Sequence, residues 1–131
     1  MEIKLGQYVR DEVYFGRITK VNEYDGMFKT SRYIDIEEQY LLDHKHNLRK
    51  ERCNIKIANT PQELIEVRDL LFLNRNEPYI VEKDSYGTYI IMNNKLQYIE
   101  TLLLDITKIL TPNSNGSVYT QQWSILDDSQ R

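Results

Sequence analysis

Short runs of apolar residues recur along this chain, separated by polar residues and turn residues. They fall in residues 3–9, 17–21 and 27–34, and again in residues 65–72, 79–83 and 87–92. Runs of this length, rich in β-branched and aromatic residues, predict short β-strands. Asp25-Gly26 and Tyr86-Gly87 supply the positive φ that a tight hairpin needs. The pattern therefore predicts small antiparallel sheets or half-barrels.

Two further regions have the spacing of a helix. In residues 94–110 five apolar residues lie three or four positions apart and would share one helical face: Leu96, Ile99, Leu103, Ile106 and Leu110. A weaker stripe of the same kind consists of Tyr33, Ile36, Tyr40 and Leu48. We expect a helix over 95–111 with Asn94 as its cap, although residues 105–111 are β-branched enough to be extended instead. A single helical turn is expected to begin at Pro61.

The chain contains an internal echo. Residues 3–28 align without a gap on residues 65–90, a shift of 62 positions that matches Ile3 with Ile65 and Ile18 with Ile80. At a different spacing, "KIANTP" at 56–61 resembles "KILTP" at 108–112. Internal repeats of this size indicate duplicated structural units.

We therefore predict an α+β, strand-rich fold of two related small antiparallel β units with one or two short helices. The predicted parts are a first unit over 1–59 with a charged loop at 43–53, a second unit over 60–113, and a C-terminal loop and tail over 114–131. The two units could also share one core as a single domain.

Composition limits the classes of function. The chain is 28% charged and 40% hydrophobic, as ordinary globular proteins are, and its net charge of −3 argues against bulk electrostatic binding to nucleic acid. No apolar run approaches the roughly 18 residues of a membrane span, and the start has no apolar signal region. The single cysteine, Cys53, suits a reducing compartment. We expect a cytoplasmic protein in a bacterial cell, without membrane contact.

The sequence offers little catalytic chemistry. Asp43, His44, His46 and Cys53 could be combined into a metal site, but the Cys-x-x-Cys pair typical of structural zinc is missing. There is no Gly-x-Ser-x-Gly motif and no phosphate-cradling glycine loop. We therefore expect no metal, no cofactor and no enzymatic activity.

Two groups of residues are candidates for contact with a partner. Locally basic residues in the charged loop could contact phosphate or an acidic protein surface, although a solvated loop is the simpler interpretation: Lys45, Arg49, Lys50 and Arg52. Ten of the fourteen aromatic residues are tyrosines, which favour strands and also contact surfaces. We expect most to pack internally and a few to form a contact patch, with these aromatic candidates: Tyr8, Tyr14, Phe15, Tyr86 and Tyr89.

The segments "IKLGQYVR…GRITKV", "ELIEVRDLL" and "DITKILTP" resemble a family of small uncharacterised proteins from phages and prophages of Firmicutes. Its members open with Gly-x-Tyr-Val-Arg, carry Asp/Glu-Leu-Ile-Glu-Val-Gly-Asp in mid-chain and end with Asp-Ile-x-x-Ile-x-Thr. This chain has Arg68 where the family has glycine, and Arg68 would be strained if that glycine serves a bulge of positive φ. The resemblance implies a two-part fold like tandem Src-homology-3-like barrels, and it brings no catalytic residues.

The resemblance leads to an expected function. We expect a non-enzymatic, anti-CRISPR-like inhibitor that docks on a host protein such as a CRISPR effector nuclease, because an acidic protein can cover a cationic groove. The alternative is a nucleic-acid-binding module that uses the basic loop 45–52 and exposed tyrosines. An enzyme is the third, least supported hypothesis.

Overall fold

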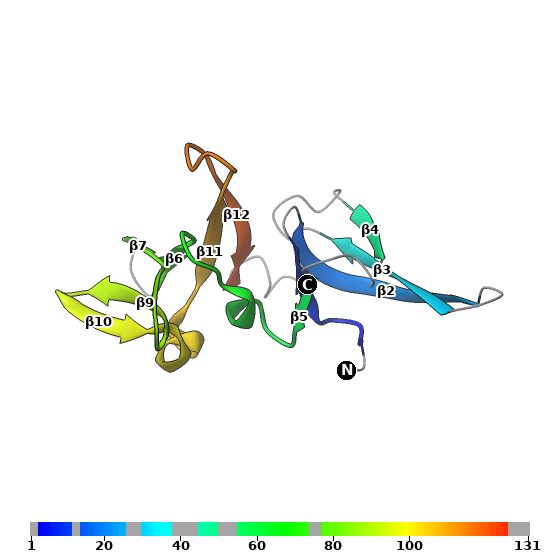
Figure 1. Ribbon diagram of the computed structural model, residues 1–131, viewed down its shortest axis with the longest axis horizontal. Helices are drawn as coiled ribbons and strands as arrows, with labels where there is room; N and C mark the ends of the chain where they lie inside the picture. Colours follow the sequence, from blue (N-terminus) through cyan, green and yellow to red (C-terminus); the bar gives the residue numbers. More distant parts are fainter. Residues whose placement is uncertain are drawn as a thin grey trace. The chain divides into compact units, whose positions relative to one another are not determined.

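The computed structural model describes residues 3–11, 14–25, 30–37, 45–49, 55–73 and 77–125, and of residues 22–25, 30–34, 37, 45–47 and 49 the backbone alone. The chain divides into two compact units, Met1–Leu64 and Ile65–Arg131. The described strands form three small antiparallel sheets, as Figure 1 shows. The prediction of a strand-rich antiparallel fold is confirmed. The described helical segments are short 3-10 helices of three or four residues.

The first unit is one five-stranded sheet. Its strands are β1 (Tyr8–Arg10), β2 (Phe15–Asp25), β3 (Thr30–Glu37), β4 (Lys45–Arg49) and β5 (Lys56–Ala58), in the spatial order β4-β3-β2-β1-β5. The short helix η1 (Pro61–Leu64) follows β5 and is the helical turn predicted at Pro61. The Arg10 guanidinium (Nη1) donates a hydrogen bond of 3.0 Å to the Leu64 carbonyl and so holds η1 against the sheet.

The core of the first unit takes one apolar residue from each of four strands. Val9, Ile18, Ile36 and Leu48 are at most 1% exposed and pack together. Partly buried hydrophobic residues pack against these four: Ile3, Tyr14, Val21, Ile55 and Ile57. Ile36 lies in β3 and Leu48 in β4, so the helical stripe predicted through them is wrong.

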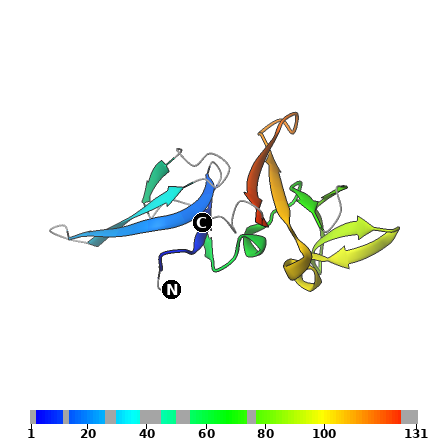
Figure 2. The ribbon, with the colours of Figure 1, turned by 180° about the vertical axis from the view of Figure 1, so that it is seen from behind.

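The second unit has two sheets. Its elements are β6 (Leu70–Phe72), β7 (Pro78–Ile80), β8 (Glu82–Asp84), β9 (Gly87–Met92), β10 (Lys95–Tyr98), η2 (Ile99–Thr101), η3 (Leu103–Asp105), β11 (Lys108–Pro112) and β12 (Tyr119–Ser124). The spatial orders are β10-β9-β8 and β12-β11-β6-β7. Figure 2 shows the β9–β10 hairpin extending away from β6 and β11. Among the described residues, five fully buried hydrophobic side chains form the interior: Leu71, Val81, Ile90, Ile106 and Ile109.

The helix predicted over 95–111 is wrong, because this region contains β10, the short helices η2 and η3, and β11. Asn93 and Asn94 both have positive φ, 53° and 62°, and they form the turn between β9 and β10. A two-residue hairpin turn of type I′ needs positive φ at both positions, and asparagine tolerates it. Leu96, which was assigned to the apolar face of the helix, is 42% exposed on β10. The extended alternative for 105–111 is correct from Lys108 onward.

The C-terminal loop and tail predicted over 114–131 also needs correction. Residues 119–124 form β12, which pairs with β11 and buries Trp123 to 3% exposure opposite Ile109. The strand has a mostly polar sequence, YTQQWS, so alternation of apolar residues could not reveal it.

The two units repeat one backbone pattern. The Gly6 N–H donates to the Ile18 carbonyl (3.0 Å) and the Ile18 N–H to the Gln7 carbonyl (2.8 Å). In the second unit the Arg68 N–H donates to the Val81 carbonyl (2.8 Å) and the Val81 N–H to the Asp69 carbonyl (2.9 Å). The equivalent of Ile18 is therefore Val81. The ungapped alignment fails by one residue after β6 and wrongly matched Ile18 with Ile80.

The turn before each first strand is also repeated. The Lys4 N–H donates to the Gln7 side-chain oxygen Oε1 (2.7 Å), as the Glu66 N–H donates to Asp69 Oδ2 (2.9 Å). The third residue of each turn has positive φ, and together with the hydrogen bonds above this is the arrangement of a G1 β-bulge.

The second sequence echo also falls on equivalent strands. In β5, Ala58 lies opposite Tyr8 of β1, and in β11, Leu110 lies opposite Leu70 of β6. Lys56 and Lys108 take the matching positions at the other end of these pairings. The first unit has the order β5-β1-β2-β3-β4 in one sheet, and the second has the corresponding strands in two sheets, β11-β6-β7 and β8-β9-β10, with β12 added beside β11.

Candidate functional site

One face of the β8–β10 sheet combines acidic, aromatic and apolar side chains. Cross-strand partners lie on the same face, and Tyr89 is opposite both Glu82 and Tyr98, while Ile91 is opposite Leu96. Asp84 lies two residues after Glu82 and therefore shares the face. We call these residues the acidic-aromatic face: Glu82, Asp84, Tyr89, Ile91, Leu96 and Tyr98.

The acidic-aromatic face is open to solvent. Ile91 is 53% and Leu96 is 42% exposed, whereas Ile90, on the opposite face, is completely buried. Lys83 and Lys95 lie on the opposite face by the same alternation. Among the described residues of the three strands, none on the acidic-aromatic face is a lysine or arginine. The face is therefore negatively charged although the sheet as a whole is mixed.

The two tyrosines of the face are held in place. The rings of Tyr89 and Tyr98 meet edge to face, with centroids 6.2 Å apart and planes at 72°. The Tyr98 hydroxyl donates a hydrogen bond of 2.9 Å to Asp84 Oδ2. A ring fixed at both its edge and its hydroxyl loses little further freedom on binding a partner.

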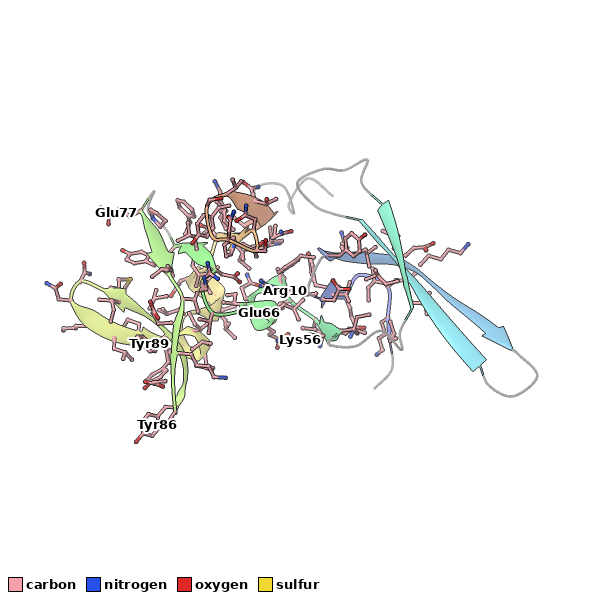
Figure 3. The ribbon with its side chains drawn as sticks, turned by 45° about the horizontal axis from the view of Figure 1, so that its top comes forward. Arg10, Lys56, Glu66, Glu77, Tyr86 and Tyr89 are labelled. Atoms are coloured by element: carbon pink, nitrogen blue, oxygen red, sulfur yellow. The ribbon has the colours of Figure 1, made fainter. Side chains whose placement is uncertain are left out.

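Asp84 also organises the β8–β9 turn. Its Oδ1 accepts hydrogen bonds from the N–H groups of Tyr86 (2.8 Å) and Gly87 (3.1 Å). This turn projects Tyr86, which is 85% exposed and points away from the ribbon in Figure 3. An exposed tyrosine offers a large ring with a polar tip to a partner.

The same contacts shift two pKa values. Desolvation alone would raise the pKa of Asp84, but the hydrogen bonds from Tyr86, Tyr98 and Gly87 outweigh it and hold the pKa below its ordinary 3.8. The hydrogen bond to Asp84, together with desolvation and the neighbouring acidic groups, raises the pKa of Tyr98 above its ordinary 10.0. Asp84 is therefore an anion at neutral pH and Tyr98 a neutral donor.

Two of the predicted contact residues are core residues. Tyr8 is 7% and Phe15 is 2% exposed, so neither offers a contact surface and the prediction needs correction there. Tyr8 begins the three-residue strand β1, and Phe15 begins the eleven-residue strand β2 opposite Arg10. The Arg10 guanidinium carbon lies 5.4 Å from the Phe15 ring centroid. Tyr14 is half-buried and packs against the core of the first unit.

The basic candidates for partner contact lie in and after β4. Lys45 and Arg49 begin and end β4, and their side chains are outside the described part of the chain, as are Lys50 and Arg52 altogether. His46 has a described backbone in β4, and Asp43, His44 and Cys53 lie outside the described residues. Among the described side chains, no three His, Cys, Asp or Glu residues gather as metal ligands.

Of the predicted aromatic contacts, Tyr86 and Tyr89 lie together on one sheet, with Tyr86 exposed and Tyr89 half-buried. Leu96 and Tyr98 were not among the predicted contact residues because a helix was expected there. Ile91 lies in a strand that the sequence predicts, but alternation alone does not say which face of that strand is exposed. The signal that identifies these residues is Asn93-Asn94 between two short alternating runs, which is typical of a hairpin.

Comparisons with family models, with curated proteins and with solved structures found no match. Within the described ranges, no helix is long and apolar enough to cross a membrane.

Proposed function

We propose that this chain is a non-enzymatic binding protein that docks through its acidic-aromatic face on a positively charged surface of another protein. The observation that carries the proposal is one sheet face on which exposed Ile91 and Leu96 lie next to the Tyr89–Tyr98 pair. Glu82 lies opposite Tyr89 and Asp84 follows further along the same face, while the lysines of these strands lie on the opposite face. Monomeric proteins rarely expose such a cluster without a use for it.

The chemistry of the face defines the partner. Tyrosine rings attract lysine and arginine side chains through cation–π contacts, and the carboxylates of Glu82 and Asp84 attract them through charge. The apolar pair Ile91 and Leu96 would supply the desolvated centre that protein interfaces need. An arginine-bearing or lysine-bearing surface with an apolar centre satisfies all of these groups.

The same charges disfavour nucleic acid at this face, because phosphate would be repelled by Glu82 and Asp84. The alternative of a nucleic-acid-binding module rests on the basic loop 45–52, whose side chains lie outside the described residues. We therefore favour a protein partner.

Two further points belong to the proposal. The strand order, with the fifth strand beside the first and the fourth at the far end, supports a Src-homology-3-like unit in each half of the chain. The resemblance to phage proteins supports a bacterial host protein as partner, and a CRISPR effector nuclease is the first to test because its nucleic-acid grooves are cationic.

The test is affinity capture from bacterial lysate with the wild-type chain and with the double variant Ile91→Ser, Leu96→Ser. A matched control changes the opposite face, Lys83→Ser with Lys95→Ser. We expect the wild type and the control to retain the same basic-surfaced protein and the face variant to lose it, and a captured nuclease to lose cleavage activity when the chain is added. Equal capture by all three chains would reject docking through the acidic-aromatic face. No inhibition of a captured nuclease would reject the role as a nuclease inhibitor.

A further inference from the structure

In the described part of the first unit, one strand of the second unit has no counterpart. In the second unit β11 pairs with β6 on one side and with β12 on the other. In the first unit the equivalent strand, β5, pairs with β1, and among the described residues no strand lies on its other side. Figure 1 shows β12 running beside β11. The repeat thus identifies a specific open edge.

The backbone groups at that edge follow from the hydrogen-bond pattern. In an antiparallel ladder, hydrogen-bonded and non-hydrogen-bonded pairs of opposite residues alternate. The Ile18 N–H donates to the Gln7 carbonyl, so the next hydrogen-bonded pair of β1 and β2, two residues along, is Val9 with Gly16. The neighbours of Val9 on β1 therefore bond to β5. Since Val9 lies opposite Ile57, the N–H and C=O of Ile57 point away from β1, toward the open edge.

The second unit shows what such groups bind. Ile109, the equivalent of Ile57, lies opposite Trp123 of β12. The Ile125 N–H donates to the Thr107 carbonyl (2.8 Å), so the Ile109–Trp123 pair, two residues further along, is hydrogen-bonded as well. With β12 in place Ile109 is completely buried. Ile57 packs against the core of the first unit but is only half-buried.

We infer that the edge of β5 is a docking site for an extended strand from a partner protein, which pairs antiparallel with Ile57 and places a large aromatic residue opposite it. Directly opposite residues share a face, so this aromatic side chain would extend the core cluster Val9, Ile18, Ile36 and Leu48 as Trp123 extends the core of the second unit. Such strand addition takes its affinity from main-chain hydrogen bonds and its specificity from side-chain pockets.

A surface depression of about 450 Å³ borders β5 and is lined by Gln7, residues 56–59, Glu63 and Leu64. The Gln7 side-chain N–H donates to Asn59 Oδ1 (3.0 Å), which holds one end of the depression. The site lies in the first unit and does not depend on the acidic-aromatic face.

The experiment is a titration of the ¹⁵N-labelled full chain with an acetylated, amidated peptide of the sequence VYTQQWSI, which copies residues 118–125. We expect saturable shifts of the Ile57 and Ala58 amide signals, with a Kd below about 1 mM. A short strand that binds through few contacts is expected to have an affinity in this range. Methylation of the peptide's tryptophan amide nitrogen should weaken binding about tenfold or more, because it removes the donor to the Ile57 carbonyl. Replacement of that tryptophan by serine should weaken it similarly.

Several results would overturn the inference. These are no shifts up to 1 mM peptide (about the weakest affinity expected), shifts at Ile109 and Leu110 that show exchange with β12, or equal binding of the N-methylated peptide. Concentration-dependent shifts of Ile57 without peptide would assign the edge to a second copy of the chain instead. Ile57→Pro removes the outward N–H and should abolish binding, and if that variant fails to fold the N-methylated peptide decides. Tyr86→Ala should bind the peptide as the wild type does, which separates this site from the acidic-aromatic face.

Discussion

Gly6 and Arg68 occupy the same backbone position in the two units, and its positive φ suits the glycine but not the arginine. Their φ angles are 86° and 78°, and each N–H begins the same bulge, bonded to Ile18 in the first unit and to Val81 in the second. Glycine adopts this conformation at little cost, whereas a residue with a Cβ does not. The strain expected at Arg68 from its sequence is therefore located at a specific backbone position.

Arg68→Gly should stabilise the second unit. The left-handed conformation costs a residue such as arginine about 1–2 kcal/mol, and the greater freedom of glycine in the unfolded chain returns about 0.4–1 kcal/mol of that. We expect a net gain of about 0.5–1 kcal/mol in the free energy of unfolding. Urea unfolding followed by the fluorescence of Trp123, the single tryptophan, measures it.

The control is the reverse change, Gly6→Arg, which should destabilise the first unit by about 1–2 kcal/mol. Circular dichroism follows it, because the first unit has no tryptophan. A loss of stability in Arg68→Gly would show that the arginine side chain contributes more than its backbone costs.

Truncation of Phe15 should lower the free energy of unfolding far more than truncation of Tyr86. Phe15→Ala removes a side chain that is 2% exposed and should cost about 3–5 kcal/mol. Tyr86→Ala removes one that is 85% exposed and should change the free energy of unfolding by no more than about 0.5 kcal/mol. Thermal unfolding of both variants by circular dichroism checks this, and equal losses would contradict the assignment of Tyr86 to a surface role.

Trp123 should be needed for its shape and not for its N–H. Its indole Nε1 is buried and has no hydrogen-bond partner in the described part of the chain. Trp123→Ala should therefore cost about 3–5 kcal/mol, and Trp123→Phe about 1–1.5 kcal/mol, the cost of an imperfect fit. Urea unfolding followed by circular dichroism compares the two, and similar losses would indicate that the N–H has a partner after all.

The turn at Asp84 should make the second unit sensitive to acid. Because the pKa of Asp84 is lowered in the fold, its contribution to stability is complete above its unfolded value of 3.8 and is lost as the pH falls through the lowered folded value. Tyr98, with a raised pKa, contributes below pH 10.0 and loses this contribution as the pH rises through its folded value.

Asp84→Asn is the matched variant for this prediction. The difference in unfolding midpoint between wild type and Asp84→Asn should be constant near neutral pH and should shrink below about pH 4, where the wild-type carboxylate becomes protonated. Tyr98→Phe should remove the alkaline limb and weaken the acid limb, because one of the hydrogen bonds that lower the pKa of Asp84 is lost. A difference that does not change with pH would show that the carboxylate charge has no role in the turn.

The sequence predicted the strands better than the surfaces, for physical reasons. Alternation and turn residues identify strands because they are local, and the duplicated "KI" of β5 and β11 marks strands that do pair alike. Alternation does not say which face is covered, so Tyr8 and Tyr86 looked equivalent although one is buried and the other exposed. The helical spacing of Leu96 and Ile99 is accidental, because Asn93 and Asn94 reverse the chain just before them.

The central claim is that the acidic-aromatic face binds a protein. Its most direct test is photo-crosslinking inside bacteria that express the chain with benzoylphenylalanine in place of Tyr86, compared with the same photo-reactive residue in place of Lys83 on the opposite face. We predict a protease-sensitive, nuclease-resistant adduct from position 86 that is missing from position 83 and disappears when Ile91 and Leu96 are replaced by serine. A nuclease-sensitive adduct, or identical adducts from both positions, would contradict the account.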